Sequence, residues 1–144
     1  VVTGRTKHYI SAFGEHVIAE EVEDAMLRAL EKAQLSIREF TVAPMVAQDK
    51  GKSFHEWFVE FENEPGDLGA FAATVDENLR KKNVYYDDLI SGNILQQLRI
   101  TSIRKNGFAD YMKSIGKLGG QNKVPRLSNN RAIAEELKRF TAGR

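Results

Sequence analysis

The spacing of hydrophobic residues changes several times between residues 8 and 104, and this alternation constrains the fold more than any other feature. Over residues 17–34 the apolar residues recur at helical spacing, and charged residues hold the opposite face. The apolar positions are Ile18, Val22, Ala25, Met26, Ala29, Leu30 and Ala33. Glu20 and Glu21 fall in the first turn, where the helix dipole favours negative charge. We therefore predict an amphipathic helix over 17–34.

Four short segments have strand character, and a second helix lies among them. The predicted strands span 8–13, 40–46, 55–62 and 98–103. The second helix starts at Leu68, after the N-cap residue Asp67, and ends in Arg80-Lys81-Lys82. A short helical or irregular piece covers 85–90. The order β-α-β-β-α-β is that of a ferredoxin-like α+β sandwich. We assign residues 1–7 to a hinge, 8–104 to the sandwich and 105–144 to a basic extension, all within one domain.

The segment 55–62 alternates between large apolar and acidic residues. The apolar positions are Trp57, Val59 and Phe61, the acidic ones are Glu56, Glu60 and Glu62, and Phe58 breaks the alternation. We expect the apolar residues to form core and the glutamates to form a solvated face, because nothing nearby in the sequence would desolvate a carboxylate pair. The segment is close enough to 40–46 for a hairpin, in which Pro44 favours an edge position.

The last third of the chain is basic. Residues 1–94 carry a net charge of −7 and residues 95–144 carry +8. A short helix is predicted over 108–115 and a final one over 129–140, with Ile133, Leu137 and Phe140 inward. Between them lies the loop 116–128, which includes GKLGGQNKVPR and combines three glycines with two lysines and an arginine. This asymmetry indicates a surface that faces an anion, or a basic extension that packs against the acidic part of the chain.

Composition excludes several classes of protein and site. The 144 residues include no Cys, which excludes disulfides, thiolate metal sites and cysteine nucleophiles and fits a cytoplasmic location. No apolar run approaches the ~18 residues of a membrane-spanning helix, and no signal-like start is present. Because the chain begins with Val1 rather than Met, we expect it to be a piece of a longer protein.

No complete active site is evident from residue types alone. His8, His16 and His55 lack the spacing of metal ligands, so we expect no metal site and a structural or surface role for each histidine. Trp57 and the phenylalanines are expected in the core. The sequence contains neither a Walker A motif nor a GxSxG nucleophile motif.

Two segments carry a resemblance to known enzymes. The stretch from Gly4 to Glu23 resembles the hinge and first strand-turn-helix of adenylate-forming enzymes, G-R-x-[DK]-x-x-[IV]-K-x-x-G followed by a helix that starts with E-[IV]-E. The matching positions are Gly4, Arg5, Lys7, Ile10, Gly14, Glu21, Val22 and Glu23, whereas Ser11 stands where many members have Lys.

The second segment is Gln121-Asn122-Lys123-Val124-Pro125-Arg126, which is similar to the Q-Y-K-T-P-R stretch of the auxin-responsive acyl acid amido synthetases, the Gretchen Hagen (GH-three) family. Asn122 and Val124 differ from the plant form. Leu98-Arg99-Ile100 and residues 108–112 (FADYM) also resemble members of that family. In the expected order, the resemblance covers nearly the whole chain.

This resemblance implies a mobile C-terminal domain of an ATP-dependent ligase that activates a carboxylic acid as an acyl-adenylate and transfers it to an amino acid. It implies that Lys123 reaches the phosphates as the catalytic lysine, and that Arg126, Lys117, Gly119 and Gly120 contact the nucleotide phosphates. Arg5 and Lys7 would form the hinge. ATP and Mg²⁺ would be bound mainly by an N-terminal adenylation domain outside this chain, so we expect these residues alone to be inactive.

Elementary chemistry supports such a loop. Adenylation moves negative charge onto the departing pyrophosphate, which a positioned lysine stabilises. Arg126 can grip two phosphate oxygens in a fork, glycines allow close approach of the backbone, and Pro125 limits the slack beside the cation.

Two other classes stay open at this point. A ferredoxin-like sheet with a basic arm also fits a single-stranded nucleic-acid module, although the exposed aromatic pattern of sheet-face RNA readers is missing and an acidic face would repel phosphates. A protein-interaction module that uses a sheet edge is the other alternative. We expect neither nucleic acid nor membrane as a partner.

Overall fold

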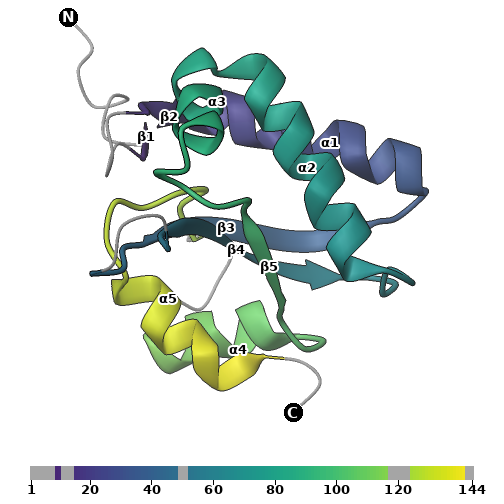
Figure 1. The fold of residues 1–144 in the computed structure, drawn as a ribbon. Coiled ribbons are helices and arrows are strands. Elements are labelled where there is room, and N and C mark those ends of the chain that lie inside the picture. Colours follow the sequence, from purple (N-terminus) through teal and green to yellow (C-terminus); the bar gives the residue numbers. More distant parts are fainter. Residues whose placement is uncertain (1–8, 11–14, 49–51, 117–123, 142–144) are drawn as a thin grey trace, which may run out of the picture.

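A three-stranded sheet lies between two helical layers (Figure 1). The computed structural model describes residues 9–10, 15–48, 52–116 and 124–141. The strands of the sheet are β3 (Ile37–Met45), β4 (Phe54–Phe61) and β5 (Arg99–Ser102), in the order β3-β4-β5. One layer holds α1 (Ala19–Ala33), α2 (Leu68–Lys82) and α3 (Val84–Ser91); the other holds α4 (Gly107–Ser114), α5 (Ala132–Leu137) and a 3-10 turn over Lys138–Phe140.

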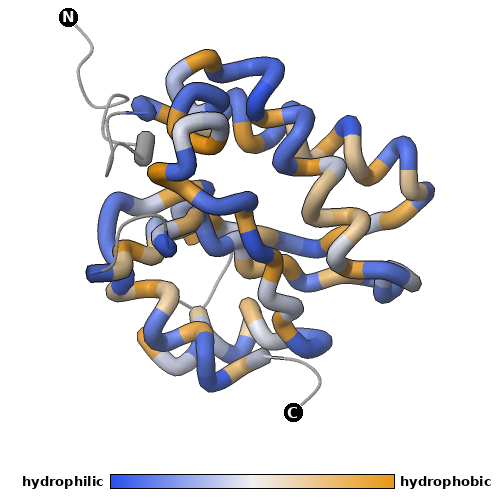
Figure 2. The backbone as a smooth tube through the Cα atoms, viewed as in Figure 1, coloured by the Kyte–Doolittle hydropathy of each residue, from blue (hydrophilic) through white to orange (hydrophobic). Residues whose placement is uncertain are grey.

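The helices begin and end close to the predicted positions. At α1, Glu21 Oε1 accepts from the backbone N of Ile18 at 3.1 Å, so the helix starts at Ala19, two residues later than predicted. At α2, Asp67 Oδ1 accepts from Ala70 N at 3.0 Å, which confirms the predicted N-cap. Apolar and hydrophilic positions alternate along both helices (Figure 2), as expected for helices with one buried face.

The α+β class is confirmed, but the sheet is only roughly ferredoxin-like. β3 and β4 form the predicted antiparallel hairpin, with Val42 opposite Trp57. β5 then pairs in parallel directly with β4, with Ile100 opposite Trp57. The first strand, β1 (Tyr9–Ile10), pairs instead with β2 (Val17–Ile18) in a separate two-stranded ladder, because β5 takes the place beside β4.

Two hydrophobic cores lie on opposite faces of the sheet. The larger core joins α1 and α2 to Trp57, Val59 and Phe61 of β4, as the alternation predicts. The smaller core joins α4 and α5 to Phe58, which is fully buried. The residue that broke the alternation is therefore the one that anchors the C-terminal extension.

The prediction of a solvated glutamate face is wrong for Glu56 and Glu60. Glu60 is 2% exposed, and its two carboxylate oxygens accept from the backbone N of Asn106 at 2.8 Å and of Phe108 at 3.2 Å, at the start of α4. Glu56 accepts from Arg131 Nη1 at 2.7 Å. Only Glu62 of the three is exposed. The alternation within 55–62 does not reveal this burial, because α4 and α5, from the last third of the chain, cover this face of the hairpin.

Replacing Glu60 by alanine should lower the free energy of unfolding by about 1–3 kcal/mol, since the buried N–H of Phe108 and the part-buried N–H of Asn106 lose their acceptor. Urea denaturation measures the change. The exposed neighbour two residues on provides the control, because Glu62→Ala should stay within about 0.5 kcal/mol of the parent. Equal losses in both variants would contradict a buried capping role for Glu60.

Candidate functional site

The basic loop ends on the outer edge of β3. Val42 N donates to the carbonyl O of Arg126 at 2.9 Å, and Ser128 N donates to the carbonyl O of Val42 at 2.9 Å. Thr41 Oγ1 also donates to the carbonyl O of Pro125 at 2.6 Å. Val42 and Leu127 form a parallel bridge, so the last residues of the loop add to the sheet next to β3. Pro44 accordingly lies in an outer strand, although that strand is partly covered.

Both flanks of the loop are fixed in the fold. Val124 is buried in the core under α4 and α5, and Leu127 is buried in the core under α1 and α2. On the other flank α4 ends at Ser114, and Gly116 has φ 77°, in the left-handed region that favours glycine. The predicted site residues between these flanks, Lys117, Gly119, Gly120 and Lys123, lie outside the described residues, as do the hinge residues Arg5 and Lys7.

Arg126 is the predicted site residue that the structure describes. Its Nη1 lies 2.7 Å from Glu39 Oε1 and its Nε lies 3.1 Å from Glu23 Oε2, while Nη1 also donates to the carbonyl O of Phe40. The guanidinium carbon lies 4.2 Å from the centre of the Phe40 ring, which stacks on Trp57. A phosphate contact by Arg126 stays a prediction, and Glu23 and Glu39 would compete with the phosphate for the guanidinium.

These contacts bear on the charge asymmetry. Arg126 and Arg131, both from the basic third, pair with glutamates of the acidic part, namely Glu23, Glu39 and Glu56. For these two arginines the packing alternative is therefore observed.

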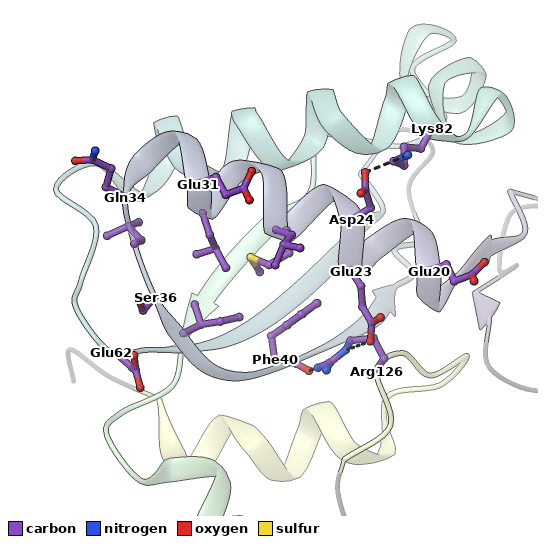
Figure 3. Close-up of a pocket in the computed structure, with 15 residues that line it drawn as sticks. Glu20, Glu23, Asp24, Glu31, Gln34, Ser36, Phe40, Glu62, Lys82 and Arg126 are labelled. Carbon is purple, nitrogen blue, oxygen red and sulfur yellow. Dashed lines mark hydrogen bonds and ion pairs between the residues drawn. The ribbon is translucent and has the colours of Figure 1, made fainter.

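A groove of about 1130 Å³ opens beside Arg126, between α1 and β3 (Figure 3). Figure 3 shows Arg126, Glu23 and Phe40 together, and Gln34, Ser36 and Glu62 at the opposite end. The wall formed by α1 contributes Met26, Leu27 and Leu30 among other residues. Sequence reasoning missed this groove, since only the docking of α1 against the sheet creates it.

A buried polar network lies where the chain enters α1. The side chains of Glu15 and His55 are fully buried, and Glu15 Oε2 lies 2.6 Å from His55 Nε2. Asn83 Nδ2 donates to the carbonyl O of Glu15 at 3.1 Å and to Glu21 Oε1 at 3.0 Å. The segment from Glu15 onward is thus tied to β4 and α3, so any movement about a hinge near residues 5–7 would begin before Glu15.

The same region holds a second buried pair. Tyr86 OH donates to Asp76 Oδ1 at 2.5 Å, and Leu98 N donates to the same oxygen at 3.2 Å. Burial raises the pKa of Asp76, although the hydrogen bonds from Tyr86 and Leu98 act in the opposite direction. Burial, together with the charge of Asp76, raises the pKa of Tyr86.

The sequence did carry a signal for part of this network. His55 shares the strand parity of Trp57 and Val59, so it faces the same core, where an imidazole needs a partner. The structural role predicted for His55 agrees with this position, and His16 is exposed.

Among the described residues, no group of three or more His, Cys, Asp or Glu side chains is placed to hold a metal ion. None of the helices in the described ranges is both long and apolar enough to cross a membrane.

Asp76→Asn should change how stability depends on pH. Because folding raises the pKa of Asp76, its protonated form stabilises the fold at low pH, and this contribution is lost as pH rises through the folded-state pKa. The unfolding free energy of the parent minus that of Asp76→Asn should therefore fall as the pH rises above the ordinary Asp pKa of 3.8. Urea titrations across this range measure it, with Asp88→Asn as the control for a carboxylate lost from the surface. A difference that rises with pH would contradict the direction of the shift.

Comparisons with known proteins agree with one another. The sequence profile of the GH3 family C-terminal domain matches residues 20–132. The solved structure of "GH3.15 acyl acid amido synthetase" superposes with a TM-score of 0.73 at 19% identity, over 95% of this chain and 27% of that chain. The structure of "AtGH3.15 acyl acid amido synthetase in complex with 2,4-DB" also gives 0.73, at 15% identity, over 96% of this chain and 26% of that chain. At these identities the superpositions show a shared fold.

The chain spans about a quarter of the length of these two structures. A comparison with curated proteins gives no match.

Proposed function

The chain belongs to the GH3 family and matches the C-terminal domain of that family. We propose that it is part of an ATP-dependent ligase that joins a carboxylic acid to the amine of an amino acid. The family match over residues 20–132 is the observation that carries this proposal. The structural similarity to two acyl acid amido synthetases agrees with it at the level of the fold.

The proposed reaction has two steps. In the first, an oxygen of the carboxylate attacks the α-phosphorus of ATP, the bond to the bridging oxygen breaks, and pyrophosphate leaves. In the second, the amine nitrogen attacks the acyl carbon of the adenylate, AMP leaves with the electron pair of the broken bond, and the amine gives up a proton. The identity of the acid and the amine depends on pockets in the N-terminal domain.

Lys123 is the residue to which we assign the cation of the first step. It directly precedes Val124, which is buried in the core under α4 and α5, so the chain is anchored immediately after the lysine. An ammonium group that meets the departing pyrophosphate stabilises charge that develops in the transition state. Lys117, Gly119, Gly120 and Arg126 would complete the contacts to phosphate.

The rest of the site belongs to the N-terminal domain in this proposal. That domain would bind the adenine and the Mg²⁺, which offsets the charge of the phosphates when bound. Movement about Arg5 and Lys7 would bring the loop to the phosphates for the first step and withdraw it for the second. A cytoplasmic location is part of the same proposal, in accord with a chain that has no cysteine.

Lys123→Ala in the full-length enzyme should slow adenylation about 10²- to 10³-fold, the loss typical for one preorganised group that stabilises developing charge. The ATP–pyrophosphate exchange rate measures this step. Transfer to the amine, started from preformed acyl-adenylate, should change far less. Lys113→Ala, at an exposed position near the end of α4, is the matched control and should exchange at the parental rate. Normal exchange in Lys123→Ala would remove the lysine from the mechanism.

The chain of 144 residues by itself should catalyse no ATP–pyrophosphate exchange, because the proposal places the adenine and acid sites in the other domain. The full-length enzyme, assayed at the same concentration with a panel of carboxylic acids, should exchange. Exchange by residues 1–144 alone would show that the nucleotide site is complete within this chain and would overturn the division between domains.

A further inference from the structure

The groove between α1 and β3 has an apolar floor. Leu27 is 58% exposed, and it lies beside Met26, Leu30, Leu35 and Ile37 along the groove. The volume of the groove, about 1130 Å³, exceeds the roughly 300–1,000 Å³ typical of small-molecule pockets. The shape and lining therefore suit a segment of polypeptide better than a small ligand.

The rim of the groove is acidic. The carboxylates of Glu20, Glu31 and Glu62 are exposed at its margin, and within the ranges that the structure describes none of them forms an ion pair. By contrast, Asp24 pairs with Arg28 and Lys82, and Glu23 pairs with Arg126. Three like charges around an apolar strip favour a partner with apolar residues at its centre and basic residues at its edges.

We propose that this groove is the surface on which the N-terminal domain of the same enzyme docks, through a segment that carries apolar side chains for the floor and Lys or Arg for the rim. The proposal rests on the proposed function, which makes the chain one of two domains. About three-quarters of each related structure lies outside the part matched by this chain, so a large partner is available in the same polypeptide.

The position of the groove supports this occupant. Arg126 lines the groove and also belongs to the basic loop, so the two features share one residue. The described end of the loop, Pro125 to Ser128, lies on the outer edge of β3. The groove adjoins that edge through Ile37 and Phe40, so the approaching domain meets both.

The test uses the full-length enzyme with ATP and Mg²⁺ at low salt. The double variant Glu31→Lys/Glu62→Lys and the single variant Leu27→Glu should increase the radius of gyration measured by small-angle X-ray scattering. They should also slow ATP–pyrophosphate exchange about tenfold, as expected when the docked population falls by that factor. High salt should expand the parent toward the charge-reversed variant, because salt screens the rim.

Two matched controls lie away from the groove. Glu77→Lys reverses an exposed charge on α2, and Ile94→Glu places a carboxylate at a residue that is 48% exposed. Both should leave the radius of gyration at the parental value. Thermal unfolding of each groove variant should match the parent, since the substituted side chains lie at the surface.

Scattering that is the same in the groove variants and the parent would overturn the proposal. A parent that is dimeric and becomes monomeric in Leu27→Glu would assign the groove to a second copy and would also overturn it. Failure of the proposed function looks different. An enzyme that forms no acyl-adenylate leaves the scattering comparison intact, and Lys123→Ala should slow exchange about 10²- to 10³-fold without changing the radius of gyration.

Discussion

The burial of β4 on both faces is the constraint on which the rest of the structure depends. Trp57 and Val59 pack under α1 and α2, while Phe58 and Glu60 lie under α4 and α5. An antiparallel hairpin can leave one face in water, but this strand is also paired in parallel with β5 and has no solvated face over most of its length. The C-terminal extension is therefore a structural layer of the domain, and it carries the basic loop with it.

Local patterns in the sequence predicted most of the elements. The helical spacing of Val22, Met26 and Leu30 gave α1, and the Asp67 cap gave the start of α2, because both signals depend on neighbours within a few residues. The arrangement of strands was less accessible. Whether β1 or β5 lies beside β4 depends on contacts between segments far apart in the chain, and no local periodicity encodes that choice.

The site divides in the same way. Arg126 was singled out for its charge and its place beside glycines, but its partners Glu23 and Glu39 come from elements about 90 to 100 residues away, and only the fold brings them together. The solvated face predicted for Glu56 and Glu60 is wrong for the same reason, because their partners also lie far away in the sequence. The pairing of His55 with Glu15 was within reach, since an imidazole on the inward parity of a strand requires a buried partner. Lys123, at the centre of the proposed chemistry, is identified only by resemblance to a family. The profile match shows that the chain belongs to this family.

The contacts of Arg126 and Glu39 at Phe40 have a consequence for how the protein behaves at high concentration. The backbone N of Phe40 donates to Glu39 Oε1 at 3.0 Å, and its carbonyl accepts from Arg126, so both main-chain groups at this point are occupied by side chains. Farther along, both main-chain groups of Val42 are bonded to Arg126 and Ser128, at the end of the loop. A strand whose outer hydrogen-bonding groups are already taken offers no template for cross-β pairing. The contacts at Phe40 and Val42 thus protect this part of the outer edge of β3 against pairing with other chains.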